Sequence, residues 1–215
     1  LFRSGVLAIN NATAANSMTG AVIRFNGGVL QYNFDLNGVT LSQQASLQVY
    51  GSSSTITGFT SIGAATVTNA GLDYTGEGGT LRLAYAIGNS SGSPIRHYFN
   101  SVTVSNNGSL AFSQPISFST LGIFAYFSNV TLSAGKTLTV SNANTLGGTL
   151  TFLGNNAGMV GNVDIRPLVT VIATNDSGMG TAAITVNGGT FIAAASSSAG
   201  SALTLNAGEI GRAHV

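Results

Sequence analysis

Apolar and polar residues alternate with a period of two along much of this chain. The alternation is clearest in Leu81–Tyr85, Thr137–Val140 and Thr149–Phe152. A period of two places successive side chains on opposite faces of a β-strand, so each segment predicts a strand with one buried face. No window of about 11 residues or more carries the apolar i, i+3, i+4, i+7 pattern of a helix. The pattern therefore predicts an all-β protein.

One strand–turn–strand phrase recurs. It consists of an aliphatic residue, Thr, a second aliphatic residue, turn residues that usually include Gly, and another apolar residue. It occupies Val102–Leu110, Val130–Leu138, Ile184–Phe191 and Leu203–Ile210, with a degraded copy at Ala65–Leu72. Repetition of one small unit is typical of proteins that stack such units into a solenoid.

Glycines mark the turns of these units, but their spacing is irregular. The sequence Gly-Gly-Thr followed by Leu or Phe occurs at Gly78–Leu81, Gly147–Leu150 and Gly188–Phe191. Gly accepts the positive φ angles that sharp corners need. The gaps between the anchors run from 13 to 51 residues, which excludes a strict period and predicts an irregular solenoid; the anchors are Gly28, Gly79, Gly108, Gly135, Gly148, Gly189 and Gly208.

Two segments interrupt the repeated pattern. Tyr85–Phe99, which contains Ser90–Pro94, predicts a loop that protrudes between coils. Gly154–Thr181 surrounds a strand-like stretch, Leu168–Ile172, and predicts either a lateral hairpin or a less regular coil.

Two architectures fit these strands. In a parallel β-helix, each turn of chain stacks its short strands on the next turn. In an antiparallel sandwich, Asn-Gly pairs such as Asn107-Gly108 close tight hairpins. The repeated phrase, the low charge and the abundance of Asn, Ser and Thr favour the β-helix, because amides and hydroxyls can form ladders along stacked strands whereas charges in register repel.

Composition narrows the class of protein further. Only 6% of residues are charged, against roughly 25% in ordinary globular proteins. With 44% hydrophobic residues and a net charge of +1, the chain lacks the signature of disorder and the basic stripe that nucleic acid would require. Its apolar stretches are shorter than a membrane-spanning helix needs. The absence of Cys excludes disulfides and thiolate metal sites.

The two ends suggest a fragment of a longer chain. Residues 1–209 predict a single solenoid segment without an internal linker. Residues 210–215, Ile-Gly-Arg-Ala-His-Val, correspond to the translation of a common short-read sequencing adapter and are therefore expected to be non-native.

The repeats resemble the autotransporter-associated β-strand repeats of large bacterial surface proteins. The resemblance lies in Val130–Val140, Leu146–Phe152 and Ile184–Phe191, and in the shorter phrases Asn26–Asn33 and Ile165–Leu168. It implies a right-handed parallel β-helix in the passenger region of a protein that is secreted or displayed at the outer membrane. That family offers no catalytic motif and no cofactor site to transfer to this chain.

The predicted function is structural: a stalk-like, adhesive passenger segment rather than an enzyme. Its predicted partners are the neighbouring coils of the same chain, with carbohydrate or other cell-surface molecules as ligands. A carbohydrate- or host-binding adhesin module is one alternative. Because a solenoid has two open ends, we also expect the isolated chain to oligomerise or aggregate.

A polysaccharide-degrading β-helix enzyme, a lyase or glycoside hydrolase, is the other alternative. Hydrolysis of a sugar needs two facing carboxylates. Asp164 with Asp176, or Asp73 with Glu77, are the pairs that a fold could bring together. The simpler interpretation is that each carboxylate caps a turn or lies in solvent. No His or Cys pair has the spacing of metal ligands, so no metal site is predicted.

Aromatic residues gather between residues 98 and 127: Tyr98, Phe99, Phe112, Phe118, Phe124, Tyr126 and Phe127. Two interpretations remain open. The pattern favours stacking in the core, and the alternative is an exposed binding strip. Tyr85, Arg96, His97 and Tyr98 are the candidate ligand-binding residues, because they fall in the predicted protruding loop. His97 is there expected to be solvated.

Overall fold

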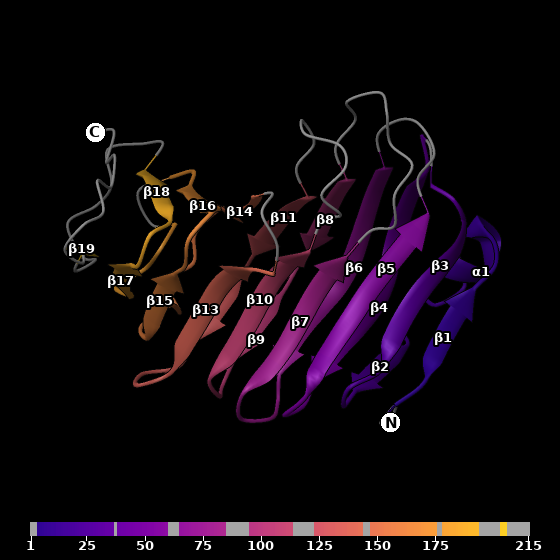
Figure 1. The fold of residues 1–215 in the computed structure, drawn as a ribbon, viewed down its shortest axis with the longest axis horizontal. Coiled ribbons are helices and arrows are strands. Elements are labelled where there is room, and N and C mark those ends of the chain that lie inside the picture. Colours follow the sequence, from indigo (N-terminus) through magenta and orange to yellow (C-terminus); the bar gives the residue numbers. More distant parts are fainter. Residues whose placement is uncertain are drawn as a thin grey trace.

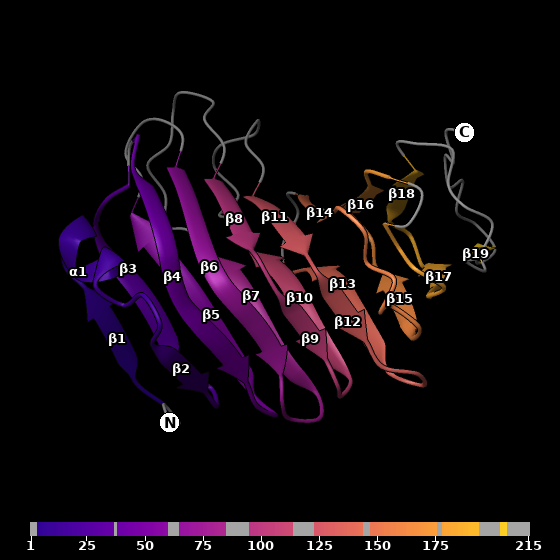
Figure 2. The ribbon, with the colours of Figure 1, turned by 180° about the vertical axis from the view of Figure 1, so that it is seen from behind.

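The computed structural model is a parallel β-solenoid in which successive turns of chain, here called coils, stack along one axis (Figures 1 and 2). It describes residues 4–36, 38–59, 65–84, 95–113, 123–143, 147–175, 178–193 and 203–205. Every strand pair in these ranges is parallel, which confirms the predicted β-helix and rules out the antiparallel sandwich.

The strands form two sheets. The nine-stranded sheet contains, in spatial order, β1 (Val6–Ile9), β3 (Val29–Asp35), β5 (Ser53–Phe59), β7 (Gly79–Ala84), β10 (Gly108–Ser113), β13 (Thr137–Asn142), β15 (Asn162–Ile165), β17 (Ala183–Val186) and β19 (Leu203–Leu205). The ten-stranded sheet contains β2 (Val22–Phe25), β4 (Thr40–Val49), β6 (Ala65–Tyr74), β8 (Ile95–Phe99), β9 (Val102–Val104), β11 (Ile123–Ser128), β12 (Val130–Leu132), β14 (Gly148–Leu153), β16 (Val169–Ala173) and β18 (Thr190–Ala193).

Each central coil contributes three short strands, one to the nine-stranded sheet and two to the ten-stranded sheet. A bend separates the two strands of the ten-stranded sheet. The first half of β6 pairs with β8, and its second half pairs with β9. β11 and β12 repeat this arrangement in the next coil. At the bend, Asn129 has a positive φ of 49° and donates a hydrogen bond from Nδ2 to the carbonyl of Asn100, 2.9 Å away. Asn tolerates this left-handed conformation, and its amide ties neighbouring coils together at the corner.

Coil length varies, as the uneven glycine spacing predicts. Paired residues of neighbouring coils are 30 positions apart at Ser109 and Thr139, but only 19 apart at Ile184 and Leu203. The shortening removes the strand after the bend: β12 is followed in the next coil only by an isolated bridge from Leu132 to Met159. The solenoid is therefore irregular.

The segment Gly154–Thr181 belongs to this shortened part of the stack. Its strands β15 and β16 lie in different sheets, and each continues the parallel register of its own sheet. The prediction of a lateral hairpin is therefore wrong, and the alternative of a less regular coil is confirmed. Buried Asn156 holds the turns together: it accepts from the Val130 N–H at 2.8 Å and donates to the Gly178 carbonyl at 2.8 Å.

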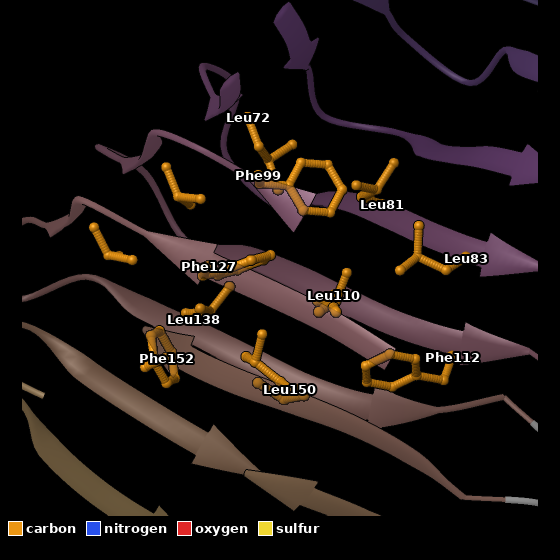
Figure 3. Packing of buried hydrophobic residues seen from close by; sticks show 14 of the residues in the cluster. Leu72, Leu81, Leu83, Phe99, Leu110, Phe112, Phe127, Leu138, Leu150 and Phe152 are labelled. Carbon is orange, nitrogen blue, oxygen red and sulfur yellow. The ribbon is translucent and has the colours of Figure 1, made fainter. Parts of the chain in front are cut away.

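The core fills the space between the sheets with apolar side chains that repeat from coil to coil. Phe99, Phe127 and Phe152 occupy one register row and meet edge to face, with centroids 5.4 and 6.0 Å apart. Figure 3 shows these rings above one another on successive strands. Complete burial of such side chains stabilises a fold by about 1.5–3 kcal/mol each. Stacking thus continues the core through the coils.

A glycine that begins a strand, either the second of the Gly-Gly phrase or Gly108 after Asn107, makes room for a side chain from another strand. A Cβ on Gly108 would overlap the ring of Tyr74, and a Cβ on Gly148 would overlap the ring of Phe112. Side-chain size also differs between neighbouring coils within one register row: Val104 follows the larger Tyr74, and Leu138 follows Gly108. The first glycine has the expected positive φ at Gly78 and Gly188, 73° and 89°. The two glycines therefore have different roles, a turn and a close approach.

Two buried tyrosines provide a matched test of hydrogen bonding in this core. The Tyr74 hydroxyl donates to the Ser109 carbonyl at 3.0 Å, whereas the Tyr32 hydroxyl has no hydrogen-bond partner among the described residues. Burial raises the pKa of both phenols. We expect Tyr74→Phe to lower the free energy of unfolding by about 1 kcal/mol, and Tyr32→Phe to leave it unchanged or raise it. Urea unfolding of the two variants checks this, and an equal loss in both would contradict it.

Candidate functional site

Three of the four candidate ligand-binding residues lie in a strand and not in a loop. Arg96, His97 and Tyr98 belong to β8, which pairs with β6 on one side and β11 on the other. Tyr85 lies outside the described residues. The prediction of a protruding loop is therefore wrong for Ile95–Phe99. This segment forms a strand because its side chains alternate: Ile95, His97 and Phe99 are buried, and the other two side chains point outward.

His97 is a core residue, and its prediction as a solvated surface candidate is wrong. Its side chain is fully buried, in the register row of Val67 and Ala125, and its ring is stacked 6.2 Å from that of Phe99. Burial lowers the pKa of His97 to about 3, because a charged imidazolium would lose its hydration there. His97 is therefore neutral at physiological pH.

Arg96 and Tyr98 join two aromatic residues of β11 in a patch on the outer face of the ten-stranded sheet. Register places Arg96 beside Phe124, and Tyr98 beside Tyr126. All four side chains are partly exposed, and we call them the aromatic strip. The two tyrosine rings are stacked, with centroids 4.4 Å apart and planes 9° apart. Both interpretations of the aromatic cluster therefore hold for part of it. Phe99, Phe112 and Phe127 lie in the core, whereas Tyr98, Phe124 and Tyr126 lie on the surface. Phe118 lies outside the described residues.

The aromatic strip combines apolar surface with hydrogen-bonding groups. The stack covers one face of each tyrosine ring, and the strip also carries the two tyrosine hydroxyls. The pKa of Tyr98 is raised, first by burial and then by Tyr126, while Arg96 acts in the opposite direction. Tyr98 therefore remains a protonated hydrogen-bond donor well above neutral pH. Arg96 adds one positive charge at the edge of the strip.

The acidic residues that could have formed a catalytic pair have other surroundings. Asp164 on β15 is paired with Arg166 at 2.7 Å and accepts from Asn187 Nδ2 at 2.6 Å. Asp176, its suggested partner, lies outside the described residues. Asp73 lies in β6 between Gln48 and Thr103, and burial raises its pKa.

Glu77, the suggested partner of Asp73, belongs to a polar cluster that spans three coils. Its carboxylate accepts from Asn107 Nδ2 and from the Asn107 backbone N–H at 3.3 Å, and lies 3.4 Å from Lys136 Nζ. These contacts, led by the Asn107 side chain, lower the pKa of Glu77. Asn107 Oδ1 in turn accepts from the Thr137 N–H at 2.9 Å. The cluster connects the turns before β7, β10 and β13.

The described ranges contain no group of three or more His, Cys, Asp and Glu side chains that could hold a metal ion. In the same ranges no helix is long and apolar enough to cross a membrane. The single helix described there, α1 (Ala12–Asn16), lies in the first coil.

No family model, no curated protein and no solved structure matches this chain.

Proposed function

We propose that this chain is a structural segment of an elongated bacterial protein, a stalk that separates whatever lies at its two ends. The observation that carries the proposal is the parallel pairing of strands from coil to coil in both sheets. The nine-stranded sheet extends from β1 to β19, and the core between the sheets is mainly apolar, with His97 and Asn69 among the buried polar residues. Stacked coils that share one core resist bending, because each coil contacts its neighbours along its full length.

The composition supports exposure of this stalk outside the cell. The chain contains no Cys, which suits passage through an oxidising compartment, and its polar surface consists mainly of uncharged Thr, Ser and Asn. The resemblance of its repeats to the passenger regions of bacterial surface proteins points the same way. We propose secretion or display at the cell surface as its location.

Antibodies raised against the folded chain test this location. If the chain is displayed, we expect intact cells of the source bacterium to be labelled as strongly as permeabilised cells; if it is secreted, we expect the antibody to detect it in the culture medium. An antibody to a cytoplasmic protein, as the control, labels only permeabilised cells. Labelling that requires permeabilisation in both cases would contradict the proposal.

A second candidate function is adhesion through the aromatic strip. The favouring observation is the outward Tyr98–Tyr126 stack beside Arg96 and Phe124, since exposed aromatic and Arg side chains are the usual anchors of binding surfaces. Hydroxyl, guanidinium and apolar groups on two adjacent strands suit a carbohydrate chain with an acidic substituent. Thr66 and Thr149 extend the row of Arg96 and Phe124 with further polar groups.

Binding of neutral and acidic oligosaccharides to the immobilised chain tests the strip. We expect acidic sugars to bind, and we expect the double variant Tyr98→Ala/Tyr126→Ala to weaken that binding at least about tenfold. Thr139→Ala, a partly exposed position on the nine-stranded sheet, is the control and should bind like the unmodified chain. Equal binding by all three proteins would remove the strip as the site.

A further inference from the structure

The polar cluster of Glu77, Asn107 and Lys136 brings a carboxylate, an amide and a primary amine together on three successive coils. The three residues lie in the turns that precede β7, β10 and β13 of the nine-stranded sheet. Lys136 Nζ lies 3.4 Å from Glu77 Oε2, and Asn107 Nδ2 donates a hydrogen bond to Glu77 Oε1. One carboxylate therefore contacts both the amine nitrogen and the amide nitrogen.

The amide of Asn107 is held with its carbonyl group polarised. Its Oδ1 accepts a hydrogen bond from the Thr137 N–H at 2.9 Å, and Thr137 is the residue next to Lys136 in the chain. A donor on a carbonyl oxygen stabilises the negative charge that develops there when a nucleophile attacks the carbon. Cγ of Asn107 is therefore an electrophilic centre beside the residue that carries the amine.

We propose that Lys136 and Asn107 form an intramolecular amide bond, which joins two successive coils covalently. Nζ of the neutral amine attacks Cγ of Asn107, and the bond between Cγ and Nδ2 breaks. A proton passes from Nζ to Nδ2 through the Glu77 carboxylate, which contacts both nitrogens, and Nδ2 leaves as ammonia. The step consumes no oxidant or other reactant, and the escape of ammonia into solution opposes its reversal.

The amine has the freedom of movement that this step requires. The Lys136 side chain is 33% exposed and that of Glu77 is 56% exposed, so neither is enclosed by the core. The flexible four-carbon stem of a lysine allows Nζ to pass from the carboxylate to the amide that the same carboxylate contacts. Lys136 is the only lysine of the sequence, and among the described residues Glu77 is the one charged side chain that contacts it.

A second cluster has the same contact between an amide and a carboxylate but no amine. Asn187 Nδ2 donates to Asp164 Oδ1 at 2.6 Å, and Arg166 is paired with Asp164 at 2.7 Å. A guanidinium group remains protonated in proteins and offers no neutral nitrogen for attack. Asn187 should therefore stay an amide, and it serves as a control within the same chain.

The bond would stabilise a chain that has no cysteine with which to form disulfides. A link between residues 107 and 136 closes a loop of about 30 residues, which restricts the unfolded chain as a disulfide does. An amide bond also forms and persists independently of the redox conditions that disulfides need. This inference goes beyond the proposed stalk function, because the bond forms or fails to form wherever the chain is located.

Mass spectrometry of the purified chain, incubated at pH 7 and at pH 9, tests the bond. We expect a species lighter than the mass calculated from the sequence by one ammonia molecule. Any remaining unlinked chain should convert faster at pH 9, because the neutral form of an amine increases about tenfold for each pH unit below its pKa. In the linked species, trypsin should not cleave after Lys136 and an amine-reactive label should find no lysine side chain. A chain that keeps its full mass and a reactive Lys136 at both pH values would overturn the proposal.

Two variants separate this bond from another loss of ammonia, since Asn107 followed by Gly108 can also close to a succinimide of the same mass. Lys136→Arg keeps a positive charge beside Glu77 and should show the full mass calculated for it. Glu77→Gln keeps a hydrogen-bond acceptor for Asn107 and should form the lighter species at least about tenfold more slowly. Far-ultraviolet circular dichroism checks that both variants fold. A lighter species that persists in Lys136→Arg, or that leaves Lys136 reactive toward the label, is a succinimide and would refute the proposed bond; an unchanged rate in Glu77→Gln would refute the role of the carboxylate.

Discussion

Replacing Gly148 with alanine is expected to destabilise the fold by about 1–3 kcal/mol, although the change adds a single methyl group. That methyl group would lie within the ring of Phe112, which reaches Gly148 across the core from β10 of the other sheet. Both residues are completely or almost completely enclosed, so neither the ring nor the strand can move without disturbing the next coil. Urea unfolding measures the loss as a lower midpoint with an unchanged m-value.

The control for this variant is Gly5→Ala, which makes the same chemical change where no atom lies within 4 Å of the added Cβ. It should leave stability within about 0.5 kcal/mol of the unmodified chain. A double-mutant cycle with Phe112→Leu then isolates the contact: the smaller side chain should reduce the cost of Gly148→Ala. If the cost is the same beside Leu as beside Phe, the clash with the ring is not its cause.

The local sequence pattern predicts the strands and the turns of this fold, but not the contacts between glycines and side chains of other coils. Alternation in Thr137–Val140 and Thr149–Phe152 correctly predicts strands β13 and β14, because burial of one face depends only on the local pattern. The paired glycines correctly mark turns. The close approach of Tyr74 to Gly108 and of Phe112 to Gly148 depends on a residue about 35 positions away in a neighbouring coil, which local patterns do not identify.

The prediction of a protruding loop with a solvated His97 was wrong for a related reason. Ile95–Phe99 alternates inward and outward like any other strand, but His97 occupies an inward position and conceals the pattern. Its row partners Val67 and Ala125 would have shown that the position is interior, had the coil length been known. Coil length varies from 19 to 30 residues, so the register that joins Tyr98 to Tyr126 follows only from the structure.

Lowering the pH from 8 to 5 is expected to reduce the free energy of unfolding by about 2 kcal/mol through His97 alone. Its pKa is about 3 in the folded protein and 6.5 as a free side chain, because burial opposes the charged form. Below pH 6.5 the unfolded chain therefore binds a proton that the folded chain excludes. The stabilisation is complete above pH 6.5 and decreases by about 1.4 kcal/mol per pH unit as the pH falls toward 3.

Urea unfolding between pH 8 and pH 5 separates His97 from the other groups. The pKa of Glu77 is lowered from its ordinary value of 4.5, so its contribution appears below this window, whereas burial raises the pKa of Asp73. Because Asp73 is the same in the unmodified chain and in the histidine variants, comparing them isolates the imidazole. His97→Leu places an apolar side chain between Val67 and Ala125 and should flatten the pH dependence, whereas His214→Leu, which removes the other histidine of the sequence, should leave it intact. A slope that survives His97→Leu, or disappears with His214→Leu, would show that the buried imidazole is not its source.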